Sequence, residues 1–224
     1  MLKQRISATL LMGLAALSIP TVSAIADEVD YTEMTPEELA EYLIFESDSF
    51  KLDQEVQEGG TARQRMVQDK LQKTCSVVGG GRPDMETLLE ISKMARESIV
   101  YPEDGIELGD WKRGAELAWS GYGYRVGHKT DDHENNEVGG NCYNCHQIGT
   151  DRTGGSLGPS LVGFGRIRGT SDAIKKYTYD VIYNSHSAFP CTNMPRFGAS
   201  GYLDQQAIAD IMAYLLDPES PVNQ

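Results

Sequence analysis

Five consecutive residues, Cys142-Tyr143-Asn144-Cys145-His146, place two thiols and an imidazole close together in the chain. The C-x-x-C-H spacing is the attachment pattern of a c-type haem. Thiols one helical turn apart can both add to the vinyl groups of the porphyrin, and the histidine that follows can then reach the iron from one face. The motif therefore predicts one covalently attached haem c, with thioether bonds to Cys142 and Cys145 and with His146 as an axial ligand.

Two other chemistries use a C-x-x-C pair, and the surrounding sequence disfavours both. A structural zinc site would need a second ligand pair at short spacing, and the sequence has none. A thioredoxin-like redox pair would follow a strand inside a βαβ unit, whereas the residues around Cys142 have helical patterning. Haem attachment is the interpretation that fits the pattern.

The opposite axial position has two candidates downstream of the motif, Met194 and His186. Met194 follows His146 by 48 residues and lies among polar residues directly before a proline, which is typical of a rigid loop. Met212, by contrast, lies in an apolar stripe and fits the common role of methionine as core filler. We predict Met194 as the ligand and His186 as a surface residue. Methionine ligation raises the reduction potential of a haem relative to ligation by two histidines.

A short loop after the motif, Leu157-Gly158-Pro159-Ser160-Leu161, is suited to hold the proximal histidine. A ligating histidine needs an acceptor for the proton on its other ring nitrogen. We expect the carbonyl of Pro159 to be that acceptor, because proline stiffens the loop and Gly158 allows a close approach. The alternative is an ordinary turn without a role at the haem.

The first 26 residues have the layout of a secretory signal peptide, and we expect them to be removed. Two basic residues precede an apolar run over 6–19, and small residues follow, with cleavage expected after Ala26 or Ala24. Such a run spans about 21 Å as a helix, which is too short for a hydrocarbon core of about 30 Å. No cysteine lies near the cleavage site, so a lipid anchor is not indicated. The protein is therefore expected in the periplasm, where disulfides are possible.

Two cysteines remain outside the motif, Cys75 and Cys191. In an exported protein a leftover pair is expected to form a disulfide. The bond would join the end of an acidic N-terminal helix to the loop that carries Met194, and it would close a long loop. Two free buried thiols, or Cys191 as an alternative iron ligand, are the competing interpretations.

Charge is unevenly distributed along the chain. The 224 residues include 33 acidic and 20 basic side chains, and the net charge of −13 argues against non-specific binding to nucleic acids. Residues 141–200 are the exception, with three acidic and six basic residues, namely Arg152, Arg166, Arg168, Lys175, Lys176 and Arg196. Arg196 lies two residues from Met194, so it is the candidate for attracting an anion or contacting a partner near the haem. Alternatively, these bases pair with the acidic N-terminal helices.

Helices are expected to position these residues, because apolar positions repeat at helical spacing and almost nothing alternates as in a strand. One predicted helix runs from Thr61 to about Cys75, and the others begin at the capping residues Thr35, Asp84, Asp110 and Asp204. Together they predict an all-α fold, with an acidic helical extension over 27–105 and a haem domain over 106–224. No run of 18 apolar residues follows the leader, so no membrane span is expected.

Gly114 lies inside the helix that begins at Asp110, where a glycine costs about 1 kcal/mol relative to alanine. Such a glycine is expected where another helix approaches closely. The predicted partner is the last helix, whose apolar stripe runs from Ala207 to Leu216.

The order of these features resembles class I cytochrome c. The resemblance is carried by Gly109-Asp110 before a helix from Trp111 to Trp119, the C-x-x-C-H motif, Gly158-Pro159, a loop methionine and a C-terminal helix. The downstream runs are more specific, and they resemble SoxX, the family of small haem subunits of SoxAX thiosulfate-oxidising complexes. These runs are Gly155-Ser156-Leu157-Gly158-Pro159-Ser160-Leu161, Phe189-Pro190-Cys191-Thr192-Asn193-Met194-Pro195-Arg196-Phe197-Gly198 and Leu216-Asp217-Pro218-Glu219-Ser220-Pro221-Val222-Asn223. The resemblance covers about residues 109–224.

The resemblance to SoxX implies a periplasmic subunit of an L-cysteine S-thiosulfotransferase. In that family a SoxA partner carries the catalytic haem, and the heterodimer joins thiosulfate oxidatively to a cysteine of the carrier protein SoxYZ. The SoxX subunit accepts the electrons and relays them to a small cytochrome c. Carried onto this sequence, the axial ligands are His146 and Met194, and the thioether bonds are to Cys142 and Cys145.

A free-standing periplasmic electron-shuttle cytochrome c is the second hypothesis, because the haem motif alone suffices for it. The two functions require different surfaces. An obligate partner should leave an apolar patch around the haem edge, whereas a shuttle needs only a small polar docking rim.

Overall fold

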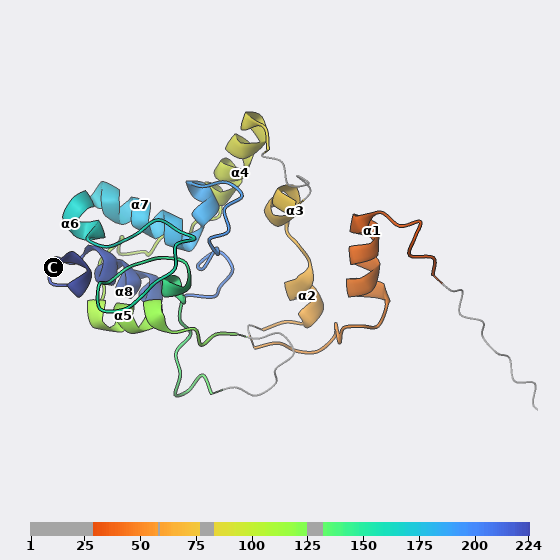
Figure 1. Ribbon diagram of the computed structural model, residues 1–224, viewed down its shortest axis with the longest axis horizontal. Helices are drawn as coiled ribbons and strands as arrows, with labels where there is room; N and C mark the ends of the chain where they lie inside the picture. Colours follow the sequence, from red (N-terminus) through yellow and green to blue (C-terminus); the bar gives the residue numbers. More distant parts are fainter. Residues whose placement is uncertain (1–28, 58, 77–82, 125–131) are drawn as a thin grey trace, which may run out of the picture.

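The computed structural model describes residues 29–57, 59–76, 83–124 and 132–224, and the predicted signal peptide, 1–26, lies outside these ranges. Within them every regular element is a helix, apart from one isolated bridge between Glu55 and Thr61. The all-α fold predicted from the sequence is therefore confirmed. Figure 1 labels the α-helices, which are α1 (Pro36–Glu41), α2 (Ala62–Met66), α3 (Lys70–Ser76), α4 (Met85–Glu97), α5 (Trp111–Trp119), α6 (Phe164–Arg168), α7 (Asp172–Tyr183) and α8 (Gln205–Leu216).

Single turns of other helix types complete the described segments. A π-helical turn, η1 (Tyr42–Glu46), continues α1, and three 3₁₀ turns are η2 (Cys142–Asn144), η3 (Ser185–Ser187) and η4 (Pro221–Asn223). Helices α6 and α7 lie outside the segments for which the sequence predicts helices. No helix in the ranges that the structure describes is long and apolar enough to cross a membrane.

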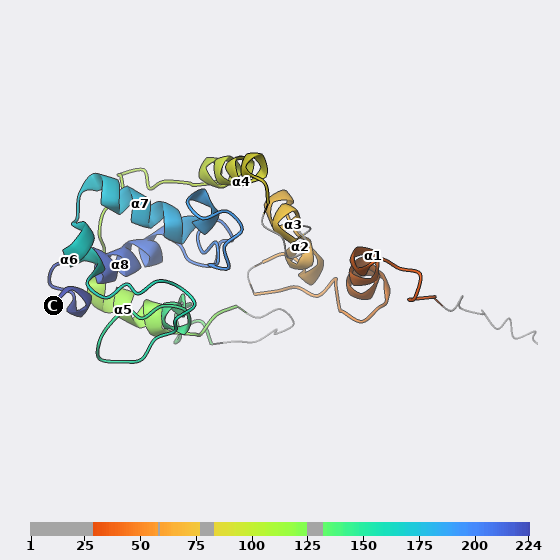
Figure 2. The ribbon, with the colours of Figure 1, turned by 45° about the horizontal axis from the view of Figure 1, so that its top comes forward.

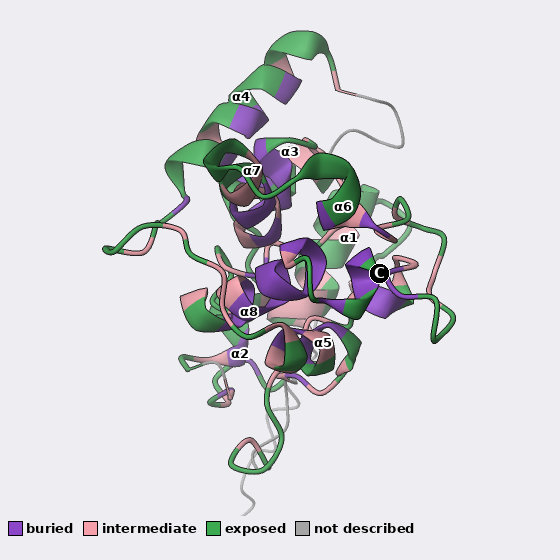
Figure 3. Cartoon of the chain, turned by 90° about the vertical axis from the view of Figure 1, so that its left-hand side faces the viewer, coloured by how far each residue is buried: buried purple, intermediate pink, exposed green. Residues whose placement is uncertain are grey.

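The core forms around α8, which packs against α5 on one side and against α7 and α6 on others. Figure 3 shows α8 as largely buried, and Ile208, Met212 and Leu216 on this helix are fully enclosed. Leu117 of α5 and Tyr179 of α7 belong to the same apolar cluster. This cluster is the framework on which the loops between the helices are held.

Gly114 makes the contact between α5 and α8 possible. A Cβ atom at this position would lie 1.9 Å from the carbonyl oxygen of Asp210 in α8, so only glycine allows the two backbones to approach this closely. The close approach predicted from the sequence is therefore confirmed. Gly114 lowers the intrinsic stability of helix α5, but it allows α5 to pack closely on α8.

Asp210 is a buried carboxylate for which the sequence pattern predicts no role, because it lies within the apolar stripe of α8. Its Oδ1 accepts hydrogen bonds from the backbone N–H of Asp110 at 2.7 Å and from Nε2 of Gln206 at 2.9 Å, and its Oδ2 pairs with Arg113. Hydrogen bonds to Glu137 and Asp210 hold the pKa of Arg113 above its usual range. A buried charge is tolerated when it is paired in this way, and the pair fixes the start of α5 on α8.

We expect Gly114→Ala to lower the free energy of unfolding by about 2–3 kcal/mol, since a methyl group forced into a packed helix contact costs about 1–3 kcal/mol. Chemical denaturation of the haem-loaded protein would measure the loss. The exposed Lys112→Ala, in the same helix, is the matched control and should change stability by less than about 0.5 kcal/mol. Equal stability of the two variants would show that α5 and α8 can separate without cost.

The prediction of one helix from Thr61 to about Cys75 is wrong, because α2 and α3 occupy this segment with Val67 extended between them. Asp69 is the physical reason for the break. Its carboxylate accepts from the N–H of Gln72 at 2.8 Å, and its own N–H donates to Oε1 of Gln72 at 3.0 Å. This reciprocal capping box starts a new helix.

The N-terminal helices form an arm beside the core formed by α5–α8. In both Figure 1 and Figure 2, α2 and α3 lie between α4 and α1, and α1 is the helix furthest from α8. Helix α4 docks on η3, where Oγ of Ser92 donates to the carbonyls of His186 and Ser187 at 3.3 Å, and Arg96 donates to Ser187 at 3.0 Å. The base of the arm is therefore fixed next to the segment that carries Met194.

The C-terminal residues fasten α6 to α8. The carbonyl of Val222 accepts from the N–H of Gly163 at 2.8 Å, and Oδ1 of Asn223 accepts from the N–H of Arg166 at 3.0 Å. Nδ2 of Asn223 donates to the carbonyls of Leu215 and Asp217 at 3.2 and 2.8 Å. The loop that contains Pro159 is thus anchored at its downstream end.

Candidate functional site

The end of α5 positions the C-x-x-C-H motif through backbone hydrogen bonds. The carbonyls of Leu117 and Ser120 accept from the N–H groups of Gly140 and Asn141 at 2.8 and 2.9 Å. Asn141 has a left-handed conformation with φ of 48°, which turns the chain into η2. There the carbonyl of Cys142 accepts from the N–H groups of the cysteine and histidine that close the motif, at 3.1 and 2.9 Å. One tight turn therefore gathers both thiols and the imidazole.

Cys142 and Cys145 are free thiols in the structure, and each is half-buried. Burial raises the pKa of the Cys142 thiol to about 12. A redox-active cysteine of the thioredoxin type needs a lowered pKa, because the thiolate is its nucleophile. The surroundings of Cys142 therefore disfavour the redox-pair interpretation.

His146 is oriented by the Pro159 loop. Its Nδ1 lies 2.7 Å from the carbonyl oxygen of Pro159. A carbonyl can only accept, so Nδ1 carries the proton, and Nε2 has no hydrogen-bond partner among the residues that the structure describes. In the neutral ring Nε2 then presents a lone pair, which is the form in which histidine ligates a metal.

Gly158 is required for this arrangement, because the backbone passes directly beside the imidazole. A Cβ atom at Gly158 would lie 2.2 Å from Cε1 and 2.5 Å from Nδ1 of His146. The loop is also tied to the motif by its backbone: the N–H groups of Gly155, Gly158 and Leu161 donate to the carbonyls of Tyr143, Cys145 and Gln147, at 2.7, 2.8 and 2.8 Å. The loop and the motif therefore form one rigid unit.

Tyr143, inside the motif, anchors this unit to the core. Its hydroxyl lies 2.7 Å from the hydroxyl of Tyr214 in α8 and accepts from the N–H of Gly149 at 3.0 Å. Trp119 packs edge-on against its ring, and the guanidinium of Arg152 lies over the Trp119 ring at 4.6 Å. Sequence reasoning missed this anchor because the variable positions of a C-x-x-C motif carry no spacing signal.

Met194 lies on a loop whose start is fixed by η3. Oγ of Ser185 donates to the carbonyl of Met194 at 2.7 Å, and the Met194 N–H donates to Oγ1 of Thr192 at 3.3 Å. The side chain is partly buried and packs against the core of α5–α8, the same cluster that contacts Cys142. The structure therefore places the thioether and the first thiol of the motif against one apolar cluster.

Comparison with known proteins agrees with this geometry. The family model of cytochrome c matches residues 136–217, which include the motif, the Pro159 loop and the Met194 loop. A relative from Aquifex aeolicus (strain VF5), described as an uncharacterized lipoprotein, is 42% identical over 166 residues, which cover 70% of this chain and 74% of the relative. Residues 136–217 of the chain form a cytochrome c domain.

A cytochrome c domain implies a covalently bound haem c and a role in electron transfer. The match to the relative extends beyond the predicted haem domain, residues 106–224. Residues 106–224 make up just over half of the cytochrome, so a match over 70% of the chain includes part of the segment before residue 106. The relative thus shares some of the N-terminal extension.

The cytochrome holds its Met194 loop by a disulfide between Cys191 and Cys75 of α3. Both sulfurs belong to a small apolar cluster with Leu71, Ile91 and Ala95, which joins α3, α4 and the loop. Cys191 has a positive φ of 56°, a conformation that non-glycine residues seldom adopt, so the surrounding contacts must hold it there. The bridge closes a loop of 116 residues.

We expect peptide mapping without reductant to recover Cys75 and Cys191 in one linked pair. Closing a loop of this length stabilises a protein by about 4–5 kcal/mol in the chain-entropy model, so Cys75→Ser should lower the melting temperature clearly. Lys73→Ala, at an exposed position of the same helix, is the control and should leave the melting temperature unchanged. Alkylation of both thiols in the native, unreduced protein would contradict the bridge.

His186 is buried in the cytochrome, so the prediction of a surface histidine is wrong. Its Nδ1 accepts a hydrogen bond from the N–H of Cys191 at 2.9 Å. Burial, and then the positive charge of Arg196, lower the pKa of His186, while the charge of Asp69 opposes them. The polar residues around it resemble a surface turn in the sequence, but α4 covers them. The role that the geometry supports is to hold the backbone of the Met194 loop.

Arg196 donates to the carboxylate of Asp69 at 2.7 Å, and its side chain is mostly buried. The pair neutralises the charge that an anion contact at Arg196 would need, and it ties the Met194 loop to the start of α3. Three other bases of residues 141–200 also have carboxylate partners, namely Arg152 with Asp151, Lys175 with Glu107 and Asp172, and Lys176 with Asp180. Among these pairs in the described residues, only Arg196 with Asp69 reaches a residue before position 106.

Proposed function

We propose that the cytochrome binds one haem c through Cys142 and Cys145, with His146 and Met194 as the axial ligands. The observation that carries the proposal is the imidazole of His146, which Pro159 and Gly158 hold with Nε2 available beside two free thiols. When bound, the haem supplies reversible one-electron transfer. The chain's residues hold and orient these ligands.

We further propose that the cytochrome is the SoxX-like subunit of a periplasmic SoxAX complex. The downstream runs that resemble SoxX support this assignment, and each has a place in the fold. The first is the loop against His146, the second carries Met194, and the third contains the Val222 and Asn223 contacts that fasten the first loop. These places in the fold support the proposal that the three runs act together in holding a haem.

In this proposal the complex is an L-cysteine S-thiosulfotransferase. The thiol of a cysteine on the SoxYZ carrier and thiosulfate are joined by a new S–S bond, with the release of one proton and two electrons. The SoxA-like partner carries the catalytic haem, and this subunit accepts the electrons and passes them one at a time to a small cytochrome c. No residue of this chain is assigned a catalytic role.

Exposed apolar side chains support an obligate partner. Leu157 is 73% exposed and lies directly before Gly158, next to the His146 ring. Phe189 is 51% exposed and lies at the start of the Met194 loop. Each of the two loops that hold the proposed ligands thus presents a large apolar side chain to solvent, as expected of a surface that another subunit covers.

Purification from the native periplasm tests the assignment. We expect a stable heterodimer with a second haem protein, and thiosulfate-dependent activity with a SoxYZ-like carrier. Leu157→Asp should weaken the heterodimer, because it places a charge in an apolar contact. Ile167→Asp, at an equally exposed position of α6, is the matched control and should leave the heterodimer intact.

A free-standing periplasmic electron shuttle is the second candidate, supported by the cytochrome c family match alone. A monomer that co-purifies with no haem protein and has no response to Leu157→Asp would favour it. Export is common to both candidates. The relative's description as a lipoprotein and the apolar leader of this chain support an exported or membrane-anchored protein, and we assign the periplasm.

A further inference from the structure

The helix formed by α1 and η1 buries none of its residues. Leu39, Tyr42 and Leu43 share one of its faces, and the ring of Tyr31 lies 5.8 Å from that of Tyr42. We name these four residues the Tyr42 patch. Tyr31 is 51% exposed and Leu43 is 42% exposed, although the apolar face of an amphipathic helix is normally covered by other parts of the protein.

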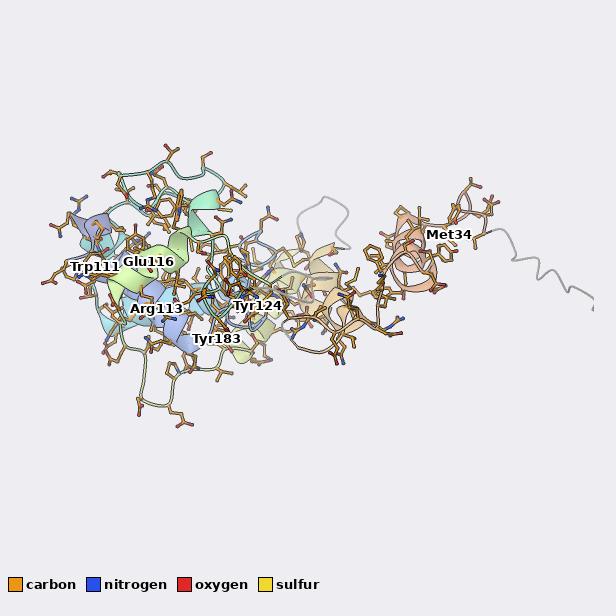
Figure 4. The ribbon with its side chains drawn as sticks, turned by 90° about the horizontal axis from the view of Figure 1, so that it is seen from below. Met34, Trp111, Arg113, Glu116, Tyr124 and Tyr183 are labelled. Carbon is orange, nitrogen blue, oxygen red and sulfur yellow. A yellow bond between two sulfur atoms is a disulfide. The ribbon has the colours of Figure 1, made fainter. Side chains whose placement is uncertain are left out.

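A helix of this length needs a partner to be stable. Isolated helices shorter than about 12–15 residues are marginal in water, and most helical stability in proteins comes from packing an apolar face. Among the described helices, α1 makes its main contacts only with η1, and from η1 the ring of Phe45 lies 5.9 Å from the guanidinium of Arg63 in α2. In Figure 4 Met34, just before α1, lies far from Trp111 and Arg113 of α5. The haem domain therefore does not supply the missing packing.

The surroundings of the Tyr42 patch are strongly acidic. Residues 30–48 contain seven carboxylates and no basic residue, and none of the seven forms an ion pair within the described ranges. The charges lie close to the aromatic pair. Desolvation and a hydrogen bond with Tyr31, and then the charges of Glu46 and Asp48, raise the pKa of Tyr42.

We propose that the α1–η1 helix is a docking element for a partner protein with an apolar groove bordered by lysine and arginine side chains. An apolar helix face laid into a groove is a recurrent mode of recognition, and opposite charges around the groove would guide and orient the helix. The groove would bury the Tyr42 patch, and the basic border would neutralise the seven carboxylates.

Charge argues against three other occupants of the Tyr42 patch. A second copy of the helix would bring two unneutralised acidic surfaces together. A bilayer with anionic lipids would repel the carboxylates. Among the described basic side chains of residues 141–200, Lys176 and Arg196 already have carboxylate partners, and α6, with Arg166 and Arg168, lies at the opposite end of the molecule from α1 in Figures 1 and 2.

Photocrosslinking in the native host tests the proposal on the full haem-loaded chain. Benzoylphenylalanine replaces Leu43, and in the control it replaces Leu89, an exposed residue of α4. We expect position 43, and not 89, to form an adduct with one protein, and its purified form to bind the cytochrome less tightly as salt rises, by about tenfold between low and high ionic strength.

Two matched pairs of variants separate the apolar from the electrostatic contribution. Leu43→Ser should weaken binding of the captured protein by about tenfold or more, and Leu89→Ser should have no effect. Glu41→Lys should also weaken binding of the captured protein at low salt. Glu103→Lys, in the segment before α5, should leave this binding unchanged. The haem spectrum should stay unchanged in all four variants.

The proposal is overturned if position 43 crosslinks to a second copy, to lipid, to the haem domain of its own chain, or to nothing. It is also overturned if the captured protein binds equally well at high salt or to Glu41→Lys. The inference rests on the α1–η1 helix and not on the SoxAX assignment, so either can fail without the other.

Discussion

Gly158→Ala is expected to disrupt the proximal side of the haem site. The new methyl group would lie 2.2 Å from Cε1 of His146, so either the ring or the loop must move. The loop cannot shift freely, because backbone hydrogen bonds tie it to the motif on one side and η4 ties it to α8 on the other. We expect loss of the hydrogen bond between His146 and Pro159, and a destabilisation of about 1–3 kcal/mol.

Spectroscopy distinguishes this local effect from unfolding. Covalent haem should be retained in Gly158→Ala, since both thiols are untouched, while the low-spin signature and the reduction potential change as the imidazole is displaced. Leu157→Ala is the matched control, because its side chain points into solvent, and it should keep the spectrum of the unaltered protein. An unchanged spectrum and stability in Gly158→Ala would show that the imidazole does not need the observed position.

Local signals in the sequence predict where several of the helices start. The side chains of Thr35, Asp84 and Asp204 each accept from a backbone N–H three residues further on, so the contact is contained within one turn. Asp69 follows the same rule, yet the helical patterning across residues 61–75 hid the break. Across residues 61–75 the apolar periodicity predicts one continuous helix, whereas the capping box at Asp69 predicts a break. The two local signals conflict, and the fold follows the capping box.

Features that depend on distant segments were harder to predict. His186 is buried only because α4, some 90 residues earlier, covers η3. Asp210 is satisfied only because α5 brings Arg113 and the N–H of Asp110 to it. Neither contact leaves a trace within a short window of sequence. The position of the Pro159 loop was easier to predict, because the loop lies 13 residues from His146 and its Gly-Pro pair restricts where the carbonyl can point.

Met194→Ala is expected to keep the covalent haem and to lose methionine ligation. The thioether is the proposed distal ligand, and the loop that presents it is fixed by Ser185, by His186 through Cys191, and by the disulfide. Replacing methionine removes a ligand that stabilises the reduced state, so the reduction potential should fall and the charge-transfer band of the oxidised His/Met haem should vanish. Potentiometry and absorbance of the purified holoprotein would measure both.

Met212→Leu provides the control for this prediction. Met212 is fully buried in α8, and a swap that conserves volume costs less than about 1.5 kcal/mol, so this variant should keep both the band and the potential. The buried neighbour His186 is the competing ligand. Its Nδ1 is occupied by the N–H of Cys191, and its backbone is held under α4, so it would have to leave these contacts to reach the iron. If the band persists in Met194→Ala, another methionine is the ligand. If the unaltered protein lacks the band, and His186→Ala rather than Met194→Ala changes the low-spin spectrum, His186 is the ligand and the Met194 loop has only a structural role.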